Sequence, residues 1–149
     1  MQVTLPCPPP STVAGLLAAA VGGWDRMPTD TRVALAFTAR GRGVDLETFH
    51  PLDAEGKKRD ATPKEHEFLA DTTLTVWVLD HLDLWEEAMR RPVWPLRLGR
   101  SQDLASARTR RITLHPGAGI QGRALVPADA STSGMQVRMP HAISPDRSR

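Results

Sequence analysis

The sequence predicts an α+β fold, in which helices and strands follow a split βαβ order that lacks its first strand. Residues 13–21 have the apolar spacing of a helix, and residues 32–38 and 68–79 have the apolar alternation of strands. The 13 prolines and 11 glycines favour many short elements and loops over a helical bundle. With 149 residues and 40% hydrophobic content, the chain is long and apolar enough for one domain with a core.

The first predicted helix spans residues 11–21, after a proline-rich arm at residues 6–10 that we expect to be extended. Its apolar residues recur every three or four positions, and Gly22-Gly23 should end it. No residue of this helix is charged. We therefore expect the helix to be packed on both sides or covered by a partner.

Ser11 and Thr12 stand at the start of this helix, and two roles are open to them. Their hydroxyls can cap the helix by accepting hydrogen bonds from its first free amides. The same amides and hydroxyls can instead hold a phosphate, because a helix N-terminus attracts anions. The residues alone do not decide between these roles.

Two strands are predicted next, at residues 32–38 and 68–79, and the second is apolar on both faces, which is typical of a central strand. Between them, residues 40–66 lose the apolar period and gather glycines and cations. Such a long excursion in a small domain is usually functional or disordered. Its cations can grip a nucleic-acid backbone or stand on a mobile, solvated hairpin tip. These cations are Lys57, Lys58, Arg59 and Lys64.

A short helix is predicted after these strands, with Asp80 or Asp83 as its cap and Pro92 just beyond its end. Residues 93–98 then alternate as a strand does, and Pro95 places this strand at a sheet edge because proline cannot donate to a ladder. The order is thus helix, strand, excursion, strand, helix, strand. This is a split βαβ arrangement without its first strand.

The turn after residue 98 presents candidate anion-binding side chains. Gly99 ends the predicted strand, so Arg100 and Ser101 should emerge at its end, close to Arg97. A guanidinium is a planar fork that matches the oxygens of a phosphate. In the alternative interpretation, Arg100 pairs with Asp103 instead.

The charge is distributed unevenly along the chain, although the formal net charge is only +2. Residues 97–149 carry nine Arg and three Asp, whereas residues 1–96 carry ten Lys and Arg against 14 Asp and Glu. Arginine without lysine suits recognition of phosphates and stacked bases, and a solvated basic tail is the alternative. Short strands are predicted in this arginine-rich part at residues 110–114, 120–126 and 137–139.

Several function classes do not fit the sequence. The apolar stretch 13–21 is too short to span a membrane and lacks the basic leader of a secretory signal. Cys7 is alone, which excludes an internal disulfide and a cysteine-based zinc cluster and fits a cytoplasmic location. Residues 117–122 spell a dinucleotide fingerprint, but no helix should start at these glycines. The five histidines show no ligand spacing, so no metal or cofactor is predicted.

His66 is the one histidine for which we consider a catalytic role. His66 lies at the end of the basic excursion and is a candidate for proton transfer to RNA, because attack by a 2′-hydroxyl needs a positioned base. A surface histidine without a catalytic role is the alternative. Neither Ser11 nor Ser101 has a local base that would make it a nucleophile.

Three blocks of the sequence, taken together, resemble a known family. They are residues 8–22 (PPPSTVAGLLAAAVG), 67–71 (EFLAD) and 91–101 (RPVWPLRLGRS). In this order the blocks are similar to the fifth family of CRISPR-associated proteins, the subunits that cap the crRNA 5′ handle in type I Cascade complexes. The similarity covers most of residues 3–104.

The resemblance implies a ferredoxin-like domain, related to the RNA-recognition motif, at residues 1–104. It also implies a projecting thumb at residues 40–66 and a β-rich C-terminal region at residues 105–149. Family members use the matching positions for contacts to the RNA handle. The RNA-binding residues expected here are Arg100, Ser101, Arg97, Ser11, Thr12, Lys57, Lys58, Arg59 and Lys64.

The function that this resemblance implies is a non-catalytic crRNA-binding subunit of a type I Cascade complex in antiviral defence. Its expected partners are crRNA and the other backbone and large subunits of Cascade, with no membrane and no cofactor. The first alternative is a metal-independent endoribonuclease that processes pre-crRNA, as in type I-C relatives, which use tyrosine, lysine and histidine. This chain has no tyrosine and no adjacent Lys-His pair, so we predict no enzymatic activity.

The chain departs from the family pattern at both ends. Family members usually begin with a strand before the proline-rich arm, and they continue beyond the position of Arg149. That first strand is interior in the expected fold, so its absence would leave unpaired backbone in the middle of the sheet. We therefore expect a truncated or split member, and a fragment without activity is the second alternative to the predicted function.

Overall fold

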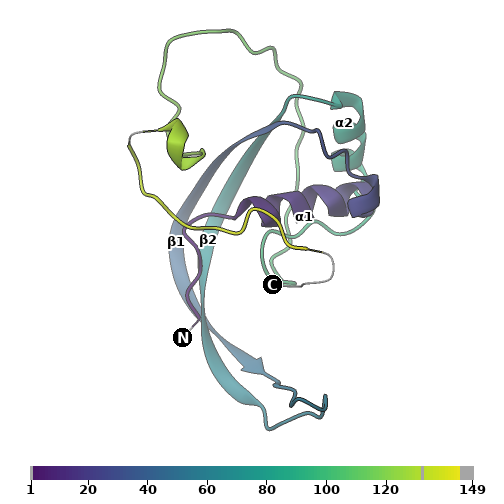
Figure 1. The fold of residues 1–149 in the computed structure, drawn as a ribbon, viewed down its shortest axis with the longest axis vertical. Helices are drawn as coiled ribbons and strands as arrows, with labels where there is room; N and C mark the ends of the chain where they lie inside the picture. Colours follow the sequence, from purple (N-terminus) through teal and green to yellow (C-terminus); the bar gives the residue numbers. More distant parts are fainter. Residues whose placement is uncertain (1, 132, 145–149) are drawn as a thin grey trace. The chain divides into compact units, whose positions relative to one another are not determined.

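The computed structural model describes residues 2–131 and 133–144 and confirms the α+β class. Figure 1 shows its main elements. In chain order the helices and strands are α1 (Pro10–Val21), β1 (Val33–Phe49), β2 (Thr62–Val78), α2 (Leu82–Arg90) and β3 (Ala124–Leu125). Short 3₁₀ turns lie at Trp24–Arg26 and Ala128–Ala130. Among the described residues, no helix has both the length and the apolar character that crossing a bilayer requires.

The three strands form one sheet in the order β2-β1-β3. β3 pairs antiparallel with β1, with Leu125 opposite Leu35 and Ala124 opposite Ala36. The N–H of Phe37 extends this pairing by donating to the carbonyl of Arg123 at 3.0 Å. The strand predicted at residues 120–126 is therefore present only as two residues. This α+β arrangement is compatible with the predicted ferredoxin-like fold.

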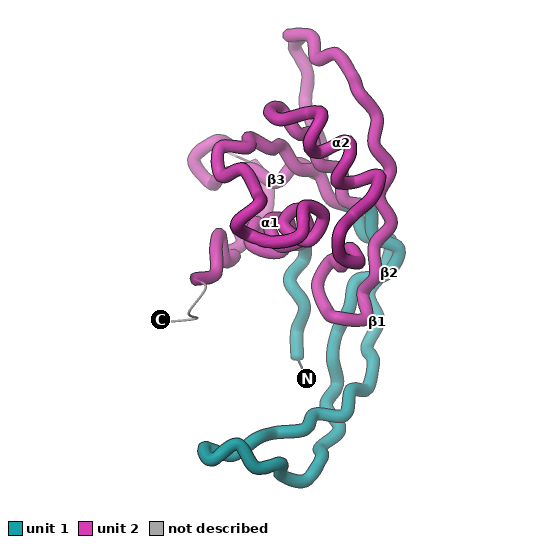
Figure 2. The backbone as a smooth tube through the Cα atoms, turned by 90° about the vertical axis from the view of Figure 1, so that its right-hand side faces the viewer, with its two compact units in different colours: residues 1–7, 38–73 teal, residues 8–37, 74–149 magenta. Residues whose placement is uncertain are grey.

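The chain divides into two compact units, which Figure 2 shows in different colours. Unit 1 comprises Met1–Cys7 and Thr38–Thr73, and unit 2 comprises Pro8–Phe37 and Leu74–Arg149. Both β1 and β2 contribute residues to each unit. The predicted boundary between residues 104 and 105 lies inside unit 2 and does not coincide with this division.

Unit 2 contains the hydrophobic core. Apolar residues of α1, β1 and α2 meet there with Leu96, and side chains of β2 pack against them as partly buried neighbours. The core residues are Val13, Leu17, Ala20, Val21, Leu35, Trp85, Ala88 and Leu96. The three residues of β2 that face this core are Leu74, Val76 and Val78.

The predicted capping role of Ser11 and Thr12 is wrong, because α1 begins one residue earlier, at Pro10. Proline suits the first helical position, since its φ is already helical and it has no N–H to satisfy. Pro9 is the N-cap residue and makes no side-chain cap. Ser11 is instead a buried residue of the first turn, at 8% exposure.

The C-terminal end of α1 is closed by its own chain. Gly22 adopts the left-handed conformation (φ 89°), as predicted for the residue that ends this helix. The N–H groups of Val93 and Trp94 then donate to the carbonyls of Ala20 and Ala19, at 3.0 and 3.2 Å. The uncharged helix is thus packed within unit 2, which explains why it carries no charge.

The second predicted helix is confirmed as α2, but its predicted cap is wrong. The N-cap residue is His81, in the left-handed conformation (φ 52°) and without a side-chain cap. Asp80 instead accepts hydrogen bonds from Arg32, at 2.9 Å from its backbone N–H and at 3.0 and 2.9 Å from its guanidinium. These hydrogen bonds lower the pKa of Asp80 to about 2.

The strand predicted at residues 93–98 is also wrong. This segment makes only an isolated bridge between Arg97 and Leu104. Its first two amides serve as caps for α1 and are not available to a sheet. Leu96 is nevertheless part of the core, at 6% exposure. The apolar residue at this position therefore marks burial and not pairing in a sheet.

The strands predicted at residues 110–114 and 137–139 are absent from the described part of the C-terminal region. Residues 106–122 are exposed throughout, so they have no core to pack on. Arg111 attaches this segment to α2 through its side chain, which forms ion pairs with Asp83 and Glu86.

Among the described residues, α1 is the first helix or strand of the chain. Gln2 makes one parallel bridge to His66 in unit 1. Its N–H donates to the carbonyl of Glu65 at 2.8 Å, and its carbonyl accepts from the N–H of Glu67 at 2.9 Å. The N–H of Thr4 also donates to the carboxylate of Glu67 at 3.1 Å, so two residues of the N-terminal segment bond to β2.

Candidate nucleic-acid interface

Unit 1 is built on a long ribbon formed by β1 and β2, in the place predicted for a thumb (Figures 1 and 2). Val44 and Leu46 on this ribbon are 56% and 70% exposed. A two-stranded ribbon without a core depends on its backbone ladder and cross-strand contacts, and it needs no apolar alternation. For this reason residues 40–66 showed no strand period, although β1 continues to Phe49.

Cross-strand contacts fit the two strands of the ribbon together. The ring of Phe68 occupies the space over Gly43, where a Cβ atom would stand 2.5 Å from the ring. Arg42 also pairs with Glu67 across the ribbon, at 3.2 Å. A glycine opposite an aromatic ring is therefore required here by packing, rather than by a turn.

The tip of the ribbon is a hydrogen-bonded turn built around Asp53. The Asp53 carboxylate accepts from the backbone N–H groups of Glu55 and Lys57, at 3.1 and 2.8 Å. The N–H of Asp53 donates to the carbonyl of Lys57 at 3.0 Å, and the N–H of Arg59 donates to the carbonyl of Pro51 at 2.9 Å. This turn sets the direction of the residues that follow it.

Three consecutive cations follow this turn, Lys57, Lys58 and Arg59, and all three are exposed. Within the described residues, no carboxylate forms an ion pair with any of them. Lys58 forms an antiparallel bridge with Leu52, so successive side chains leave opposite faces of the backbone. We call these three residues the tip cations.

Lys64 lies further along β2 and is also exposed. Its Nζ stands 4.0 Å from the centre of the Phe49 ring, a cation–π contact across the ribbon. The contact holds the side chain against the ribbon while the ammonium group remains in solvent.

Three acids of the ribbon are engaged away from the side chains of the tip cations, in a unit that has six Lys and Arg against eight Asp and Glu. Asp53 is bonded to backbone amides, and Glu67 pairs with Arg42. Asp71 pairs with Arg40 at 3.3 Å. Within the described residues the tip cations thus have no ion-pair partner, although Glu55 and Asp60 lie close to them in the sequence.

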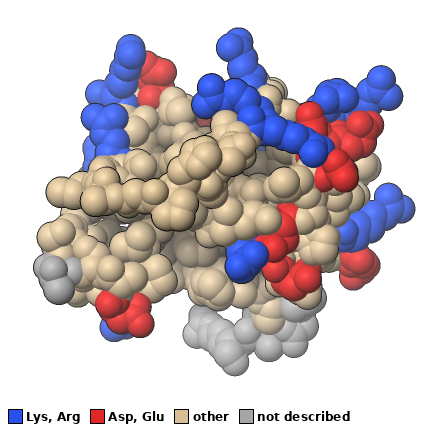
Figure 3. Space-filling model, turned by 90° about the horizontal axis from the view of Figure 1, so that it is seen from above, with Lys and Arg blue, Asp and Glu red and all other residues tan. Residues whose placement is uncertain are grey.

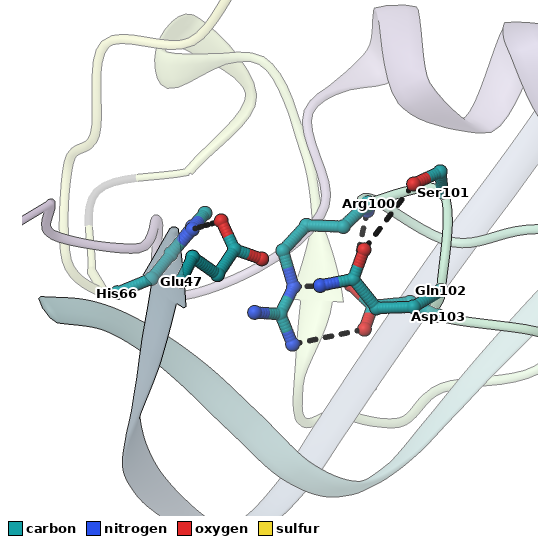
Figure 4. Close-up of polar contacts among 6 residues, drawn as sticks. All are labelled: Glu47, His66, Arg100, Ser101, Gln102 and Asp103. Atoms are coloured by element: carbon teal, nitrogen blue, oxygen red, sulfur yellow. Dashed lines mark hydrogen bonds and ion pairs between the residues drawn. The ribbon is translucent and has the colours of Figure 1, made fainter. Parts of the chain in front are cut away.

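His66 forms a cross-strand pair with Glu47, shown in Figure 4. The Nδ1 of His66 lies 3.0 Å from Oε2 of Glu47, and the imidazole side chain is 17% exposed. Within the described part of the chain, no hydrogen bond involves Nε2 of His66. A carboxylate on one ring nitrogen orients a histidine and leaves the other nitrogen to exchange protons.

In unit 2, Arg100 forms a closed pair with Asp103, which was the alternative interpretation of this turn. Nε and Nη2 of Arg100 donate to the two carboxylate oxygens of Asp103, each at 3.1 Å (Figure 4). The backbone N–H of Arg100 donates to the same carboxylate at 2.9 Å. The Arg100 side chain is 19% exposed. The guanidinium of Arg100 is therefore bonded to a carboxylate, and a phosphate would have to compete with that carboxylate for it.

The other predicted site residues of unit 2 have separate local surroundings. The hydroxyl of Ser101 donates to the side-chain oxygen of Gln102 at 3.2 Å. Arg97 is exposed, and no ion pair to it is present among the described residues. At the start of α1, the N–H groups of Ser11 and Thr12 donate to the carbonyls of Pro140 and Pro9, at 3.3 and 2.9 Å.

The start of α1 is consequently a poor phosphate site, because these first-turn amides already have partners. On the face drawn in Figure 3, Lys and Arg side chains lie beside Asp and Glu side chains and do not merge into one basic patch. Among the described residues, no group of histidine, cysteine and acidic side chains is arranged to hold a metal ion.

Glu47 was missed by reasoning from the sequence, because its partner His66 is 19 positions away. Pairing the two halves of the excursion as a hairpin would have found it. Glu47 and Phe49 are two residues apart on β1, and Lys64 and His66 are two residues apart on β2, so each pair shares one face of its strand.

Comparison with known proteins assigns the chain to a family. No curated protein matches this sequence. A family model described as CRISPR-associated protein (Cas_Cas5) matches residues 1–115, which is most of the chain. The match includes α1, the whole ribbon of β1 and β2, and α2. The chain therefore belongs to the Cas_Cas5 family of CRISPR-associated proteins.

Proposed function

We propose that this protein is a non-catalytic RNA-binding subunit of a type I CRISPR effector complex, Cascade, in which it holds the 5′ handle of crRNA. Family membership supports a CRISPR-associated role. The single observation that carries the RNA contact is the set of tip cations, Lys57, Lys58 and Arg59, which are exposed and unpaired within the described residues on a hydrogen-bonded turn.

The tip cations are suited to a phosphate backbone. No ion pair to them is present among the described residues, so phosphate contact costs no existing ion pair. The turn at Asp53 already defines their backbone, which lowers the entropy cost of ordering them on binding. Lys64 extends the cationic track along the ribbon.

In unit 2 we assign smaller parts to the remaining predicted residues. Arg97 can add an electrostatic contact because it is exposed. Arg100 and Ser101 have supporting roles, because a phosphate would have to compete with Asp103 for the guanidinium. Ser11 and Thr12 contribute least, since their backbone N–H groups are already bonded. The partners proposed are crRNA and neighbouring Cascade subunits, and a cytoplasmic location stays a prediction from the single cysteine.

The test is to remove the tip cations in the variant K57A/K58A/R59A and to measure binding of a fluorescent single-stranded repeat RNA by anisotropy at several salt concentrations. Each lost phosphate contact should flatten the plot of log K against log salt by about 0.7, so the slope should fall by about 2. At 0.1 M salt, binding should weaken by about 10–100-fold.

The matched control is the variant R108A/R110A/R138A, which removes the same charge from exposed positions of unit 2. This variant should retain most of the affinity and most of the salt slope. Equal losses in the two variants would show that net charge alone governs binding, and would overturn the assignment to the tip.

A specific observation also favours a second candidate function, a metal-independent endoribonuclease. The Glu47–His66 pair provides an oriented imidazole on the same ribbon, with Lys64 two residues before it. Incubating repeat RNA with the protein in the presence of a chelator distinguishes the two functions. We expect no cleavage, and cleavage that disappears in His66→Ala would instead favour the enzyme.

A further inference from the structure

Two tryptophans of unit 2 stand half-exposed at the C-terminal end of α1. Trp24 is 59% exposed and Trp94 is 52% exposed, whereas Trp85 lies in the core at 3%. An indole is usually buried in a core or an interface, because it has a large apolar area to remove from water. The core of unit 2 therefore does not account for either exposed ring.

Both rings meet the chain at Gly23. Trp24 follows this glycine directly, and Cη2 of Trp94 lies 3.8 Å from the position that a Cβ atom would take on it. The N–H of Trp94 donates to the carbonyl of Ala19 at 3.2 Å, and the N–H of Met27 donates to the carbonyl of Trp24 at 3.2 Å. The helix and the 3₁₀ turn thus fix the backbone of both indoles, so a ligand that packs on them loses little affinity to ordering.

The polar groups around these rings have open valences. Among the described residues, no hydrogen bond involves the indole N–H of either tryptophan. Arg26 and Arg91 lie close to the two rings in the sequence, are exposed, and form no ion pair with a described residue. Residues 22–28 and 91–97 together carry three arginines and one acid, Asp25, which gives a net charge of +2. The surroundings of the rings are therefore positive.

Exposed aromatic faces beside unpaired cations are the two components of a site for single-stranded nucleic acid. Bases of any identity stack on aromatic side chains, while arginine contacts the phosphates between them. A protein partner would have to supply acids to these arginines, and charged residues are depleted from the centre of protein interfaces. The combination of rings and cations therefore favours an RNA strand as the occupant.

We propose that Trp24 and Trp94 form a stacking platform for unpaired bases of the RNA, and that Arg26 and Arg91 contact the phosphates beside them. This inference rests on the proposed function, because the ligand is the same RNA. It adds a contact of a different kind, since the tip cations respond to charge whereas stacking needs a base that is free of a duplex. The platform therefore gives the protein a preference for single-stranded over duplex RNA.

The test compares wild type with the variant W24A/W94A, using the fluorescent single-stranded repeat RNA and an abasic strand of the same length. Each lost stack should weaken binding of the repeat RNA by about 5–100-fold. The slope of log K against log salt should stay unchanged, because no phosphate contact is lost. The abasic strand should bind wild type and variant equally. W24F/W94F keeps a ring at both positions and should recover most of the affinity.

The matched control is L114A/I120A, which removes two apolar side chains of unit 2 at 59% and 99% exposure. It should leave binding of the repeat RNA unchanged. R26A/R91A should instead lower the salt slope by about 1.4, because two phosphate contacts are lost. The comparison of repeat RNA with the abasic strand needs only wild type, so the test holds even if W24A/W94A is unstable.

Equal binding of the repeat RNA and the abasic strand by wild type would overturn the platform, and so would unchanged affinity in W24A/W94A. In both cases a lower salt slope in K57A/K58A/R59A would still support the proposed function. A wild-type protein that binds no RNA would overturn both. If W24A/W94A keeps its RNA affinity but no longer associates with another CRISPR effector subunit, the two rings form a protein contact and the inference is wrong.

Discussion

Replacing Gly22 with alanine tests the packing at the end of α1. Gly22 has φ 89°, a conformation that costs an L-residue about 1–2 kcal/mol. A Cβ atom at this position would also stand 2.9 Å from Cγ1 and 3.2 Å from Cβ and Cγ2 of Val93. Such overpacking costs about 1–3 kcal/mol. The two effects together should destabilise the protein by about 2–5 kcal/mol.

This loss is large compared with the stability of an ordinary domain, about 5–15 kcal/mol. For a chain of this size, the melting temperature of Gly22→Ala should fall by about 5–20 °C. The assay is thermal and urea unfolding followed by circular dichroism, with the free energy of unfolding compared between variant and wild type.

The control separates backbone strain from the clash with Val93. Val93 is 54% exposed, so Val93→Ala alone should cost less than about 1 kcal/mol. The double variant G22A/V93A should recover about 1–3 kcal/mol relative to G22A, because the clash is removed while the strain in φ remains. If Val93→Ala rescues nothing, the contact between the α1 end and residue 93 is not the cause and the reasoning fails.

Two further predictions concern unit 2. The pKa of Asp80 is lowered from 3.8 to about 2 by Arg32, so the pair stabilises the fold above about pH 3.8 and this stabilisation is lost as the pH falls toward 2. The melting temperature of wild type should therefore exceed that of Asp80→Asn near neutral pH, and a gap that persists at about pH 2 would contradict the assignment. Leu96→Ala should cost about 2–5 kcal/mol in urea unfolding, because Leu96 is 6% exposed within the core. Leu104→Ala is its control at 72% exposure and should change stability by less than about 0.5 kcal/mol, and equal losses would mean that residues 93–98 are not anchored by burial.

The α+β class and the two helices were predictable from local residues. The apolar spacing of α1, Gly22 at its end and the apolar face of α2 are patterns that act within a few residues. The family resemblance could also be seen in the sequence, because it rests on three short blocks of residues. These blocks lie in α1, in the ribbon and after α2. Where a local signal misled, the residue was placed differently: Ser11 is buried in the first turn of α1, and Asp80 pairs with Arg32.

Pairing was not predictable, because a strand exists only with a neighbour. Residues 93–98 have the alternation of a strand, but their first amides close α1, while residues 40–49 lack that alternation and form a strand because β2 lies beside them. The same holds for the candidate site. From the sequence, the tip cations and Arg100 could be named as candidate phosphate-binding residues, and His66 as a candidate for proton transfer. Only the tertiary structure showed that Asp103 engages Arg100 and that Glu47 reaches His66, because these partners are set by hydrogen-bond geometry and chain folding.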